Sequence, residues 1–491
     1  MSKKQEQSEQ SEVLNARFET TRAEECDQER PDPRCSRRAV LKQGAAMAAG
    51  SAAGFLGANS AMAQQAEAPA VDTGAQAGRT FRAWVQQGAQ AGVEELRLRE
   101  LQTRQVLIRT EASAPCYTLV MRGLGGTPSI PPAQTAAAAN NQQATPSIAN
   151  HTAVGVVEAV GPDVRRVRPG DRVIIGVTSQ CGQCYMCLRG RADHCQFTMA
   201  VLGSDFPAIA DRADGTPVPA ALGIGGLSEL MVVYEEYTCP VYTDVSPAQL
   251  ALLGDTAATG FAAAMCLLRV EPGSDVVILG AGAVGMGAVQ GARVMGAAQV
   301  IVSEPIARRR ELALQLGATT VLDPNTEGDN LVETIRELCK GPTDQFFSGG
   351  RGWRTGPRED NRGPDFTIEA VGRTGDLPLV EQPPDPTGIL PMQQAWEFTR
   401  RGGEIVYLGF GQPGEVSYPA TAFANRGRSV HAGQQGGLNM MRDLPRIVGL
   451  VEKGDFNLEA MVTSTWRLEQ TGEAFQVLSD RTELAPVIVF A

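Results

Sequence analysis

The sequence predicts an α/β protein in which a β-rich segment precedes a doubly wound parallel sheet. Short runs of β-branched and aromatic residues, separated by turn residues, extend from Thr80 to Val177, a pattern typical of small sheets with tight connections. After residue 250, Ala-rich helical segments alternate with short apolar runs. This alternation indicates buried parallel strands with helices on both faces of the sheet. A glycine-rich turn joins the first of these strands to its helix.

Composition sets the broad class of the protein. The 491 residues are enough for two or three domains. With 43% hydrophobic and 20% charged residues, the chain can bury a sizeable core. The net charge of −11 argues against nucleic acid and anionic lipid as partners. We expect no membrane-spanning helix, because no run reaches the roughly 18 apolar residues that one needs.

Residues 1–63 are expected to be an export signal and not part of the fold. The pair Arg37-Arg38 is followed by a weakly apolar stretch up to Leu56 and then by the small-residue site Ala61-Met62-Ala63. This order resembles a twin-arginine signal, which the export machinery reads as an address. A disordered basic N-terminus is the alternative. We therefore expect a periplasmic or otherwise exported protein in which residues 64–79 form a flexible leader.

Four cysteines lie close together, at Cys181, Cys184, Cys187 and Cys195. Four thiolates at this spacing can surround one tetrahedral Zn²⁺ at ~2.3 Å in a closed, structural site. Two disulfides are the alternative, because an exported protein meets oxidising conditions. The two cysteines of a Cys-x-x-Cys pair, however, rarely satisfy disulfide geometry outside redox motifs. The spacing therefore predicts a structural zinc site.

The glycine-rich turn Gly280-Ala281-Gly282-Ala283-Val284-Gly285 predicts a dinucleotide site. Gly280 permits the tight turn, Gly282 lets the backbone approach a pyrophosphate, and Gly285 allows the helix to pack on the strand. Glu304 ends the next strand, where a carboxylate accepts hydrogen bonds from the adenosine ribose and repels a 2′-phosphate. We therefore expect NAD. Three arginines at 308–310 make NADP the alternative, and Glu304 could also be an ordinary solvated carboxylate.

A four-cysteine loop ahead of such a unit is similar to the zinc-containing medium-chain dehydrogenase/reductase family, of the alcohol dehydrogenase type. The likeness runs from about Phe81 to the C-terminus and includes Gly161-Pro162-Asp163-Val164. It implies a GroES-like catalytic domain at 80–254, a Rossmann NAD-binding domain at 255–420, and a segment 421–491 that completes the catalytic domain. The active site would lie in the cleft between the domains. A homo-oligomer is also expected.

The same resemblance implies a catalytic zinc held by Cys116, His151 and Asp255. Three protein ligands leave a fourth position open for an alcohol or aldehyde substrate, and Thr118 would hand on the alcohol proton. Each ligand also has a plainer interpretation. Cys116 could be a small buried hydrophobe, His151 a core histidine, and Asp255 the N-cap of an Ala-rich helix.

The chain departs from the family pattern around these residues. Leu119 and Thr152 replace acids that would orient the zinc ligands, and the loss of such partners typically weakens a metal site about 10–100-fold. Tyr117 and Ala485 replace basic residues near the pyrophosphate. Two Gly/Pro/Arg-rich stretches, about 341–364 and 374–391, are expected to be loop insertions that cover the cofactor.

The expected reaction is hydride transfer between an alcohol or aldehyde and NAD(H), with the cofactor retained through export. Two alternatives remain on the same fold. One is a zinc-poor reductase of the quinone or enoyl type. The other is a non-catalytic NAD-binding protein.

Overall fold

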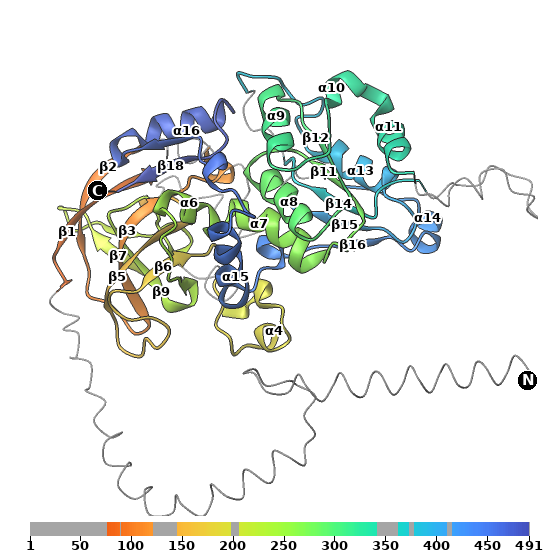
Figure 1. The fold of residues 1–491 in the computed structure, drawn as a ribbon. Helices are drawn as coiled ribbons and strands as arrows, with labels where there is room; N and C mark the ends of the chain where they lie inside the picture. Colours follow the sequence, from red (N-terminus) through yellow and green to blue (C-terminus); the bar gives the residue numbers. More distant parts are fainter. Residues whose placement is uncertain are drawn as a thin grey trace, which may run out of the picture. The chain divides into compact units, whose positions relative to one another are not determined.

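A computed structural model of the chain describes residues 76–88, 90–120, 145–197, 206–340, 362–372, 378–409 and 415–490 (Figure 1). The expected export signal, most of the expected leader and most of the first expected insertion lie outside these residues. Within them, no single helix is both long and apolar enough to cross a membrane, and only the bent pair Pro247–Gly254 and Thr256–Leu267 passes that test when its halves are joined.

The β-rich lobe contains two sheets built largely from antiparallel pairs. The first has the order β4 (Ser147–Ile148), β1 (Thr80–Gln87), β2 (Gln90–Leu98), β7 (Ala208–Asp211) and β8 (Pro217–Pro219). The second has the order β10 (Thr238–Pro240), β6 (Arg172–Ile175), β5 (Ala153–Val160), β3 (Gln105–Ser113), β18 (Pro486–Val489) and β17 (Ser464–Trp466), with β9 (Leu230–Tyr234) also paired to β3. Alternate side chains of β1, such as Phe81, Ala83 and Val85, are buried between the layers, as expected for strands with one core-facing side.

The C-terminal segment completes this lobe, as the resemblance implied. Strand β18 runs antiparallel to β3, with Ile488 opposite Ser113. In Figure 1 the blue elements β18 and α16 (Thr471–Ser479) lie beside the orange strands from the start of the lobe. Chain ends that are far apart in sequence therefore share one sheet.

The Rossmann domain is a parallel sheet with helices between its strands. Its order is β13 (Thr320–Leu322), β12 (Gln299–Ser303), β11 (Asp275–Leu279), β14 (Phe366–Glu369), β15 (Glu404–Tyr407) and β16 (Ser429–His431). The connecting helices include α8 (Ala283–Val294), α9 (Ala307–Gln315), α11 (Leu331–Leu338) and α13 (Ile389–Phe398). The strand order reverses between β11 and β14, which is where an open α/β sheet binds its ligand.

One domain boundary differs from the expectation. Strand β16 pairs with β15 in the Rossmann sheet and lies beyond residue 420, so this domain extends at least to His431. The strand is short and exposed at Ser429 and Val430. It therefore lacks the apolar run by which the other strands of the sheet are recognised.

The first Ala-rich segment after residue 250, from Ala251 to Leu268, is not one continuous helix. It consists of α6 (Pro247–Ala251), a 3-10 turn (Leu252–Gly254), α7 (Thr256–Ala262) and a π-helical turn (Ala263–Leu267). At the break, Asp255 has the non-helical angles φ −152° and ψ −86°. This break directs Asp255 away from the path of a continuous helix.

Helices α7 and α8 pack backbone against backbone. A Cβ added at Gly260 of α7 would lie 1.8 Å from the carbonyl oxygen of Val284, and one at Gly287 of α8 would lie 2.2 Å from that of Ala257. Only glycine fits at these two positions. The helix that carries Asp255 at its start is therefore in direct contact with the helix that follows the glycine-rich turn.

Candidate metal centres and cofactor site

Cys116, His151 and Asp255 meet at one point of the β-rich lobe. Cys116 follows β3, and His151 precedes the antiparallel neighbour β5, so the end of one strand lies beside the start of the other. Asp255 joins them from the break before α7. The ligand atoms of all three residues lie within 4.8 Å of one another.

The hydrogen bonds of Asp255 differ from those of an N-cap. Its carboxylate accepts no bond from the backbone N–H groups of α7. One oxygen, Oδ2, lies 3.1 Å from His151 Nε2, and the other accepts the Thr259 hydroxyl at 3.2 Å. On the other side of the group, Thr118 Oγ1 lies 3.1 Å from Cys116 Sγ. The four residues predicted for catalysis are therefore brought together.

The group stabilises a positive charge. Burial alone would lower the pKa of His151, but hydrogen bonds to Asp255 and Cys116 raise that pKa to about 10. Burial would raise the pKa of Asp255, but the hydrogen bond and charge of His151, together with bonds to Cys116 and Thr259, lower it. A thiol, an imidazole and a carboxylate around one point are a donor set that zinc accepts. The residues present therefore fit a divalent cation, which would take the place of the imidazolium proton.

Asn150 connects the two loops that carry Cys116 and His151. It has a left-handed backbone with φ +70°, a conformation that asparagine tolerates better than most residues. Its Nδ2 donates to Ser113 Oγ at 2.8 Å and to the carbonyl oxygen of Ala114 at 3.0 Å. Thr152 adds a hydroxyl bond to the same carbonyl at 3.1 Å. An amide and a hydroxyl thus hold these loops together where the family pattern would place acids near the ligands.

His151 has one ring nitrogen without a partner. Its Nδ1 is buried and makes no hydrogen bond within the part of the chain that the structure describes. Leu119, which stands where the family pattern has an acid, packs instead against an apolar cluster that contains Trp84. The ring orientation of His151 therefore depends on Asp255 and on the hydrogen bonds by which Asn150 and Thr152 join the two loops, here called the clamp.

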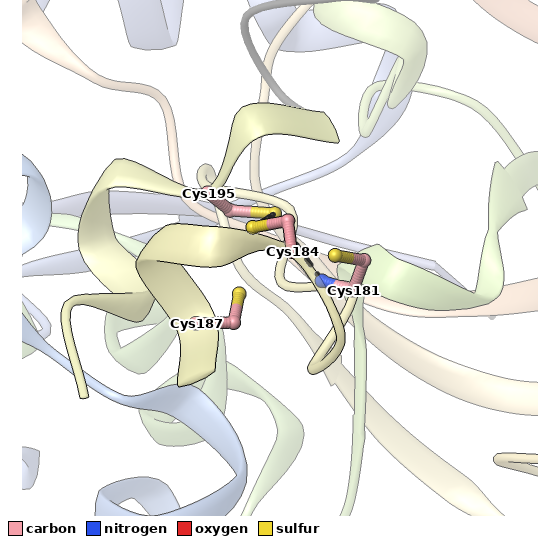
Figure 2. A group of neighbouring side chains, drawn as sticks. All are labelled: Cys181, Cys184, Cys187 and Cys195. Atoms are coloured by element: carbon pink, nitrogen blue, oxygen red, sulfur yellow. Dashed lines mark hydrogen bonds between the residues drawn. The ribbon is translucent and has the colours of Figure 1, made fainter. Parts of the chain in front are cut away.

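The second donor group is the four-cysteine loop, whose thiols are free (Figure 2). Its sulfur atoms also lie within 4.8 Å of one another. The backbone N–H of Cys181 donates to Cys195 Sγ at 3.3 Å, and that of Gln196 donates to Cys184 Sγ at 3.4 Å. Although burial opposes it, such N–H bonds lower the pKa of Cys184 to about 6. Four thiols that face one point, with amides turned toward their sulfurs, fit the predicted structural zinc.

The glycine-rich turn has the geometry that its sequence predicts. Gly280 has φ +86°, and a Cβ at Gly285 would lie 1.9 Å from the Gly280 carbonyl oxygen. Gly282 is the N-cap of α8, and no atom would contact a Cβ placed there within 4 Å. The backbone at the start of α8 is therefore open to a phosphate group.

Glu304 is buried at the end of β12, so it is not a solvated carboxylate. Its Oε2 accepts the N–H of Ala281 in the glycine-rich turn at 2.6 Å, and its Oε1 accepts the N–H of Ile306 at 3.0 Å. The three arginines behind it have different surroundings. Arg310 pairs with Asp323 and bonds the Glu304 carbonyl, whereas Arg309 is buried.

Glu369 is a further candidate residue of the cofactor site that the sequence analysis did not single out. It ends β14 at the same edge of the sheet and is fully buried. Its carboxylate accepts the N–H of Val371 at 2.7 Å and that of Gly409 at 3.3 Å, while burial raises its pKa to about 7. The acidic residue at the end of a short apolar run was the available signal.

The described part of the second insertion crosses this edge. Glu381 Oε1 accepts the N–H of Ala307 at the start of α9 at 3.2 Å, and the Gln382 carbonyl accepts Asn325 Nδ2 at 2.9 Å. A small cavity lies beneath, lined by Leu279 and by prolines of the insertion. The insertion thus covers the carboxyl ends of β11 and β12.

Comparisons with known proteins agree with this arrangement. Residues 102–243 match the family described as alcohol dehydrogenase GroES-like domain, and residues 283–378 match zinc-binding dehydrogenase. The chain is 31% identical over 418 residues to geraniol dehydrogenase of Castellaniella defragrans, covering 82% of this chain and 96% of that protein. It is 28% identical over 388 residues to S-(hydroxymethyl)glutathione dehydrogenase of Haemophilus influenzae, covering 78% and 90%. The structure of benzyl alcohol dehydrogenase from Acinetobacter calcoaceticus shares the fold, with a TM-score of 0.66 at 24% identity over 84% of this chain and 100% of that one.

Proposed function

The chain belongs to the zinc-containing alcohol dehydrogenase family, and we propose that it transfers hydride between an alcohol, or the matching aldehyde, and NAD(H). The observation that carries this proposal is the convergence of Cys116, His151 and Asp255. The relatives named above, which are dehydrogenases of geraniol and of S-(hydroxymethyl)glutathione, support an alcohol or aldehyde substrate.

Cys116, His151 and Asp255 would hold the catalytic zinc, and the four-cysteine loop would hold a structural one. A zinc ion at the first site supplies a Lewis acid for the oxygen of the alcohol or carbonyl group. The Cys116 thiolate and the Asp255 carboxylate balance its charge. Thr118, whose hydroxyl lies 3.1 Å from Cys116 Sγ, would accept the alcohol proton and pass it on.

NAD is the proposed cofactor, with NADP as the alternative. The carboxylate of Glu304 lies at the turn that would bind the dinucleotide and is held there by Ala281 and Ile306. A buried carboxylate in this position disfavours a 2′-phosphate. The glycine-rich turn itself serves either cofactor.

Export with a retained cofactor is the second part of the proposal. The twin-arginine motif supports folding before export to the periplasm or beyond, where free NAD would be scarce. The insertion supports retention, because Glu381 and Gln382 fasten it to α9 and α10 (Pro324–Glu327). Tight retention requires slow release, and affinity differences between related complexes are mostly differences in release rate. A cofactor kept in place would be recycled by a second substrate.

The decisive experiment counts metal and nucleotide in the purified mature protein. We expect two zinc ions per chain and near-stoichiometric NAD(H) released on denaturation, together with oxidation of primary or secondary alcohols. Nucleotide-free protein that is active only with added NAD would refute cofactor retention but would not contradict the proposed dehydrogenase activity. A parent protein with two zinc ions but no alcohol or aldehyde activity would refute the proposed reaction.

One observation favours a second candidate, a zinc-poor reductase of the quinone or enoyl type. The unpartnered His151 Nδ1 weakens the support of that ligand, and a chain with only the four-cysteine zinc would then reduce its substrate without metal. A count of one zinc per chain, with NADH oxidation by quinones or enones, would establish this alternative.

Self-association is proposed as well, through the free edge of the Rossmann sheet. Strand β16 pairs only with β15 among the described residues, and Val430 and the nearby Phe423 are exposed. Unpaired edges with apolar side chains favour strand addition. Light scattering on the mature protein tests this, and a monomer at micromolar concentration would refute it.

A further inference from the structure

We propose that Arg309 and Arg481 form a second anchor, facing the metal site, for the diphosphate of the dinucleotide. This inference rests on the proposed function, because it assumes that a dinucleotide binds. It assigns a role to Arg481, for which the sequence pattern provides none, and it gives Arg309 a role other than contact with a 2′-phosphate.

Arg309 is a buried cation with few partners. It lies in the first turn of α9 and is only 9% exposed. Its Nη2 donates to the carbonyl oxygen of Glu483 at 3.3 Å, whereas its Nε is buried and makes no hydrogen bond to any described residue. Burial lowers the pKa of Arg309 to about 10. The charge of Glu304 offsets part of this effect, but the buried Nε has no partner among the described residues, so a further anion would stabilise the guanidinium.

Arg481 comes from the β-rich lobe and reaches the same place. Its guanidinium carbon lies 5.1 Å from the ring centroid of Tyr117, in a cation–π arrangement. The residue is only 9% exposed and has a left-handed backbone with φ +56°. A bulky side chain rarely adopts this conformation, and holding it costs free energy.

The Rossmann domain holds this strained segment in place. Arg308 donates to the carbonyl oxygen of Arg481, and Arg309 donates to that of Glu483. The three arginines lie close enough for Arg481 and Arg308 to lower the pKa of Arg309 through their charges. Two lobes of the protein thus meet at a cluster of three arginines, whose charges Glu304 balances only in part. An anion between them would relieve this repulsion and join the lobes.

The location identifies the anion as the diphosphate. Tyr117 directly follows the metal ligand Cys116, so Arg481 lies on the metal side of the cofactor site. Arg309 follows Glu304, which marks the adenosine side. Between these ends a dinucleotide carries its diphosphate. Guanidinium groups bind phosphate oxygens through paired, charge-assisted hydrogen bonds, and two of them would supply the charges that Tyr117 and Ala485 lack.

The test compares three probes on nucleotide-free protein by calorimetry: adenosine, ADP and adenosine 2′-phosphate. Arg481→Gly removes the guanidinium and relieves the left-handed strain, so we expect it to melt no lower than the parent. Its affinity for ADP should fall ~10-fold or more, while adenosine binding stays unchanged. Arg309→Gln, which keeps a donor for the Glu483 carbonyl, should show the same pattern. The control is Arg401→Ala, an exposed arginine ahead of β15 at the opposite edge of the sheet.

Unchanged ADP affinity in both variants would overturn the inference, as would a loss confined to adenosine 2′-phosphate, which would place the arginines at the 2′-position. A parent protein that binds none of the probes and no NAD would refute the proposed cofactor itself. The two failures are therefore distinguishable.

Discussion

The clamp made by Asn150 yields a prediction in which fold stability and metal affinity separate. Asn150→Gly keeps the left-handed backbone at φ +70° but removes the amide that joins the loops of Cys116 and His151. The variant loses hydrogen bonds from Nδ2 to Ser113 Oγ and to the carbonyl oxygen of Ala114, each of which contributes about 0.5–1.5 kcal/mol, and a longer one of 3.3 Å to the carbonyl oxygen of Thr152.

Two features offset this loss. Both acceptors still make a hydrogen bond without the amide. Ser113 Oγ donates to the Thr152 carbonyl, and the Ala114 carbonyl still accepts the Thr152 hydroxyl. The variant also removes Asn150 Oδ1, a buried acceptor with no partner among the described residues, which costs about 1–3 kcal/mol where it stands. We therefore expect Asn150→Gly to lie within about 1 kcal/mol of the parent in stability. Asn150→Ala should be about 1–2 kcal/mol less stable than the glycine variant, because alanine disfavours the left-handed region.

Metal affinity should respond differently. Without the clamp, the Cys116 and His151 loops can move relative to each other, and the loss of outer hydrogen bonds around zinc ligands typically costs about 10–100-fold in affinity. The assay titrates zinc out with a chromophoric chelator, and the four-cysteine site is an internal reference that should not change. Equal zinc retention in Asn150→Gly and parent would refute the reasoning. A glycine variant less stable than the alanine variant would also contradict it.

The remaining predictions concern the metal ligands and the cofactor. Cys184→Ser should lose the structural zinc and melt several degrees lower, because a four-thiolate zinc contributes folding free energy; retained zinc and an unchanged melting temperature would contradict the assignment. Asp255→Ala should lose one zinc and keep the other, and a variant with two zinc ions and full activity would make Asp255 merely structural. Glu304→Ser should raise NADP affinity relative to NAD, an expectation that fails if the parent already prefers NADP. Because the pKa of metal-free His151 is raised from 6.5 to about 10, zinc must displace a proton below that pH; its affinity should rise at least about tenfold per pH unit up to about pH 10, and a flat profile would be inconsistent with this.

Sequence patterns were sufficient where local chemistry determines local structure. The turn at Gly280 and Gly285 follows from steric demands that only glycine meets. The four cysteines close on one point because few residues separate them. For Cys116, His151 and Asp255, which are far apart in the chain, the prediction depended on family order, and the structure brings them together.

Other features depend on tertiary contacts that no local pattern records. Strand β16 is short and half exposed, so its pairing with β15 carries no hydrophobic signal. A run of three arginines in a sequence indicates an exposed segment. Arg309 is nevertheless buried, because the β-rich lobe packs against it. The carbonyl of Arg481, whose backbone is left-handed, accepts a hydrogen bond from Arg308 of α9. The structure at these residues depends on which surfaces of the two domains pack together.

The contact between α7 and α8 has a consequence for how this protein can change shape. Gly260 and Gly287 leave no side chain between these helices, so nothing compressible separates the start of α7, where Asp255 lies, from the start of α8, where phosphate would bind. We therefore expect the pair to act as a rigid spacer between the proposed metal site and the proposed dinucleotide site. Evolution can enlarge or reshape the substrate pocket through the loops, but a single added methyl group at Gly260 would shift both ends of the reaction at once.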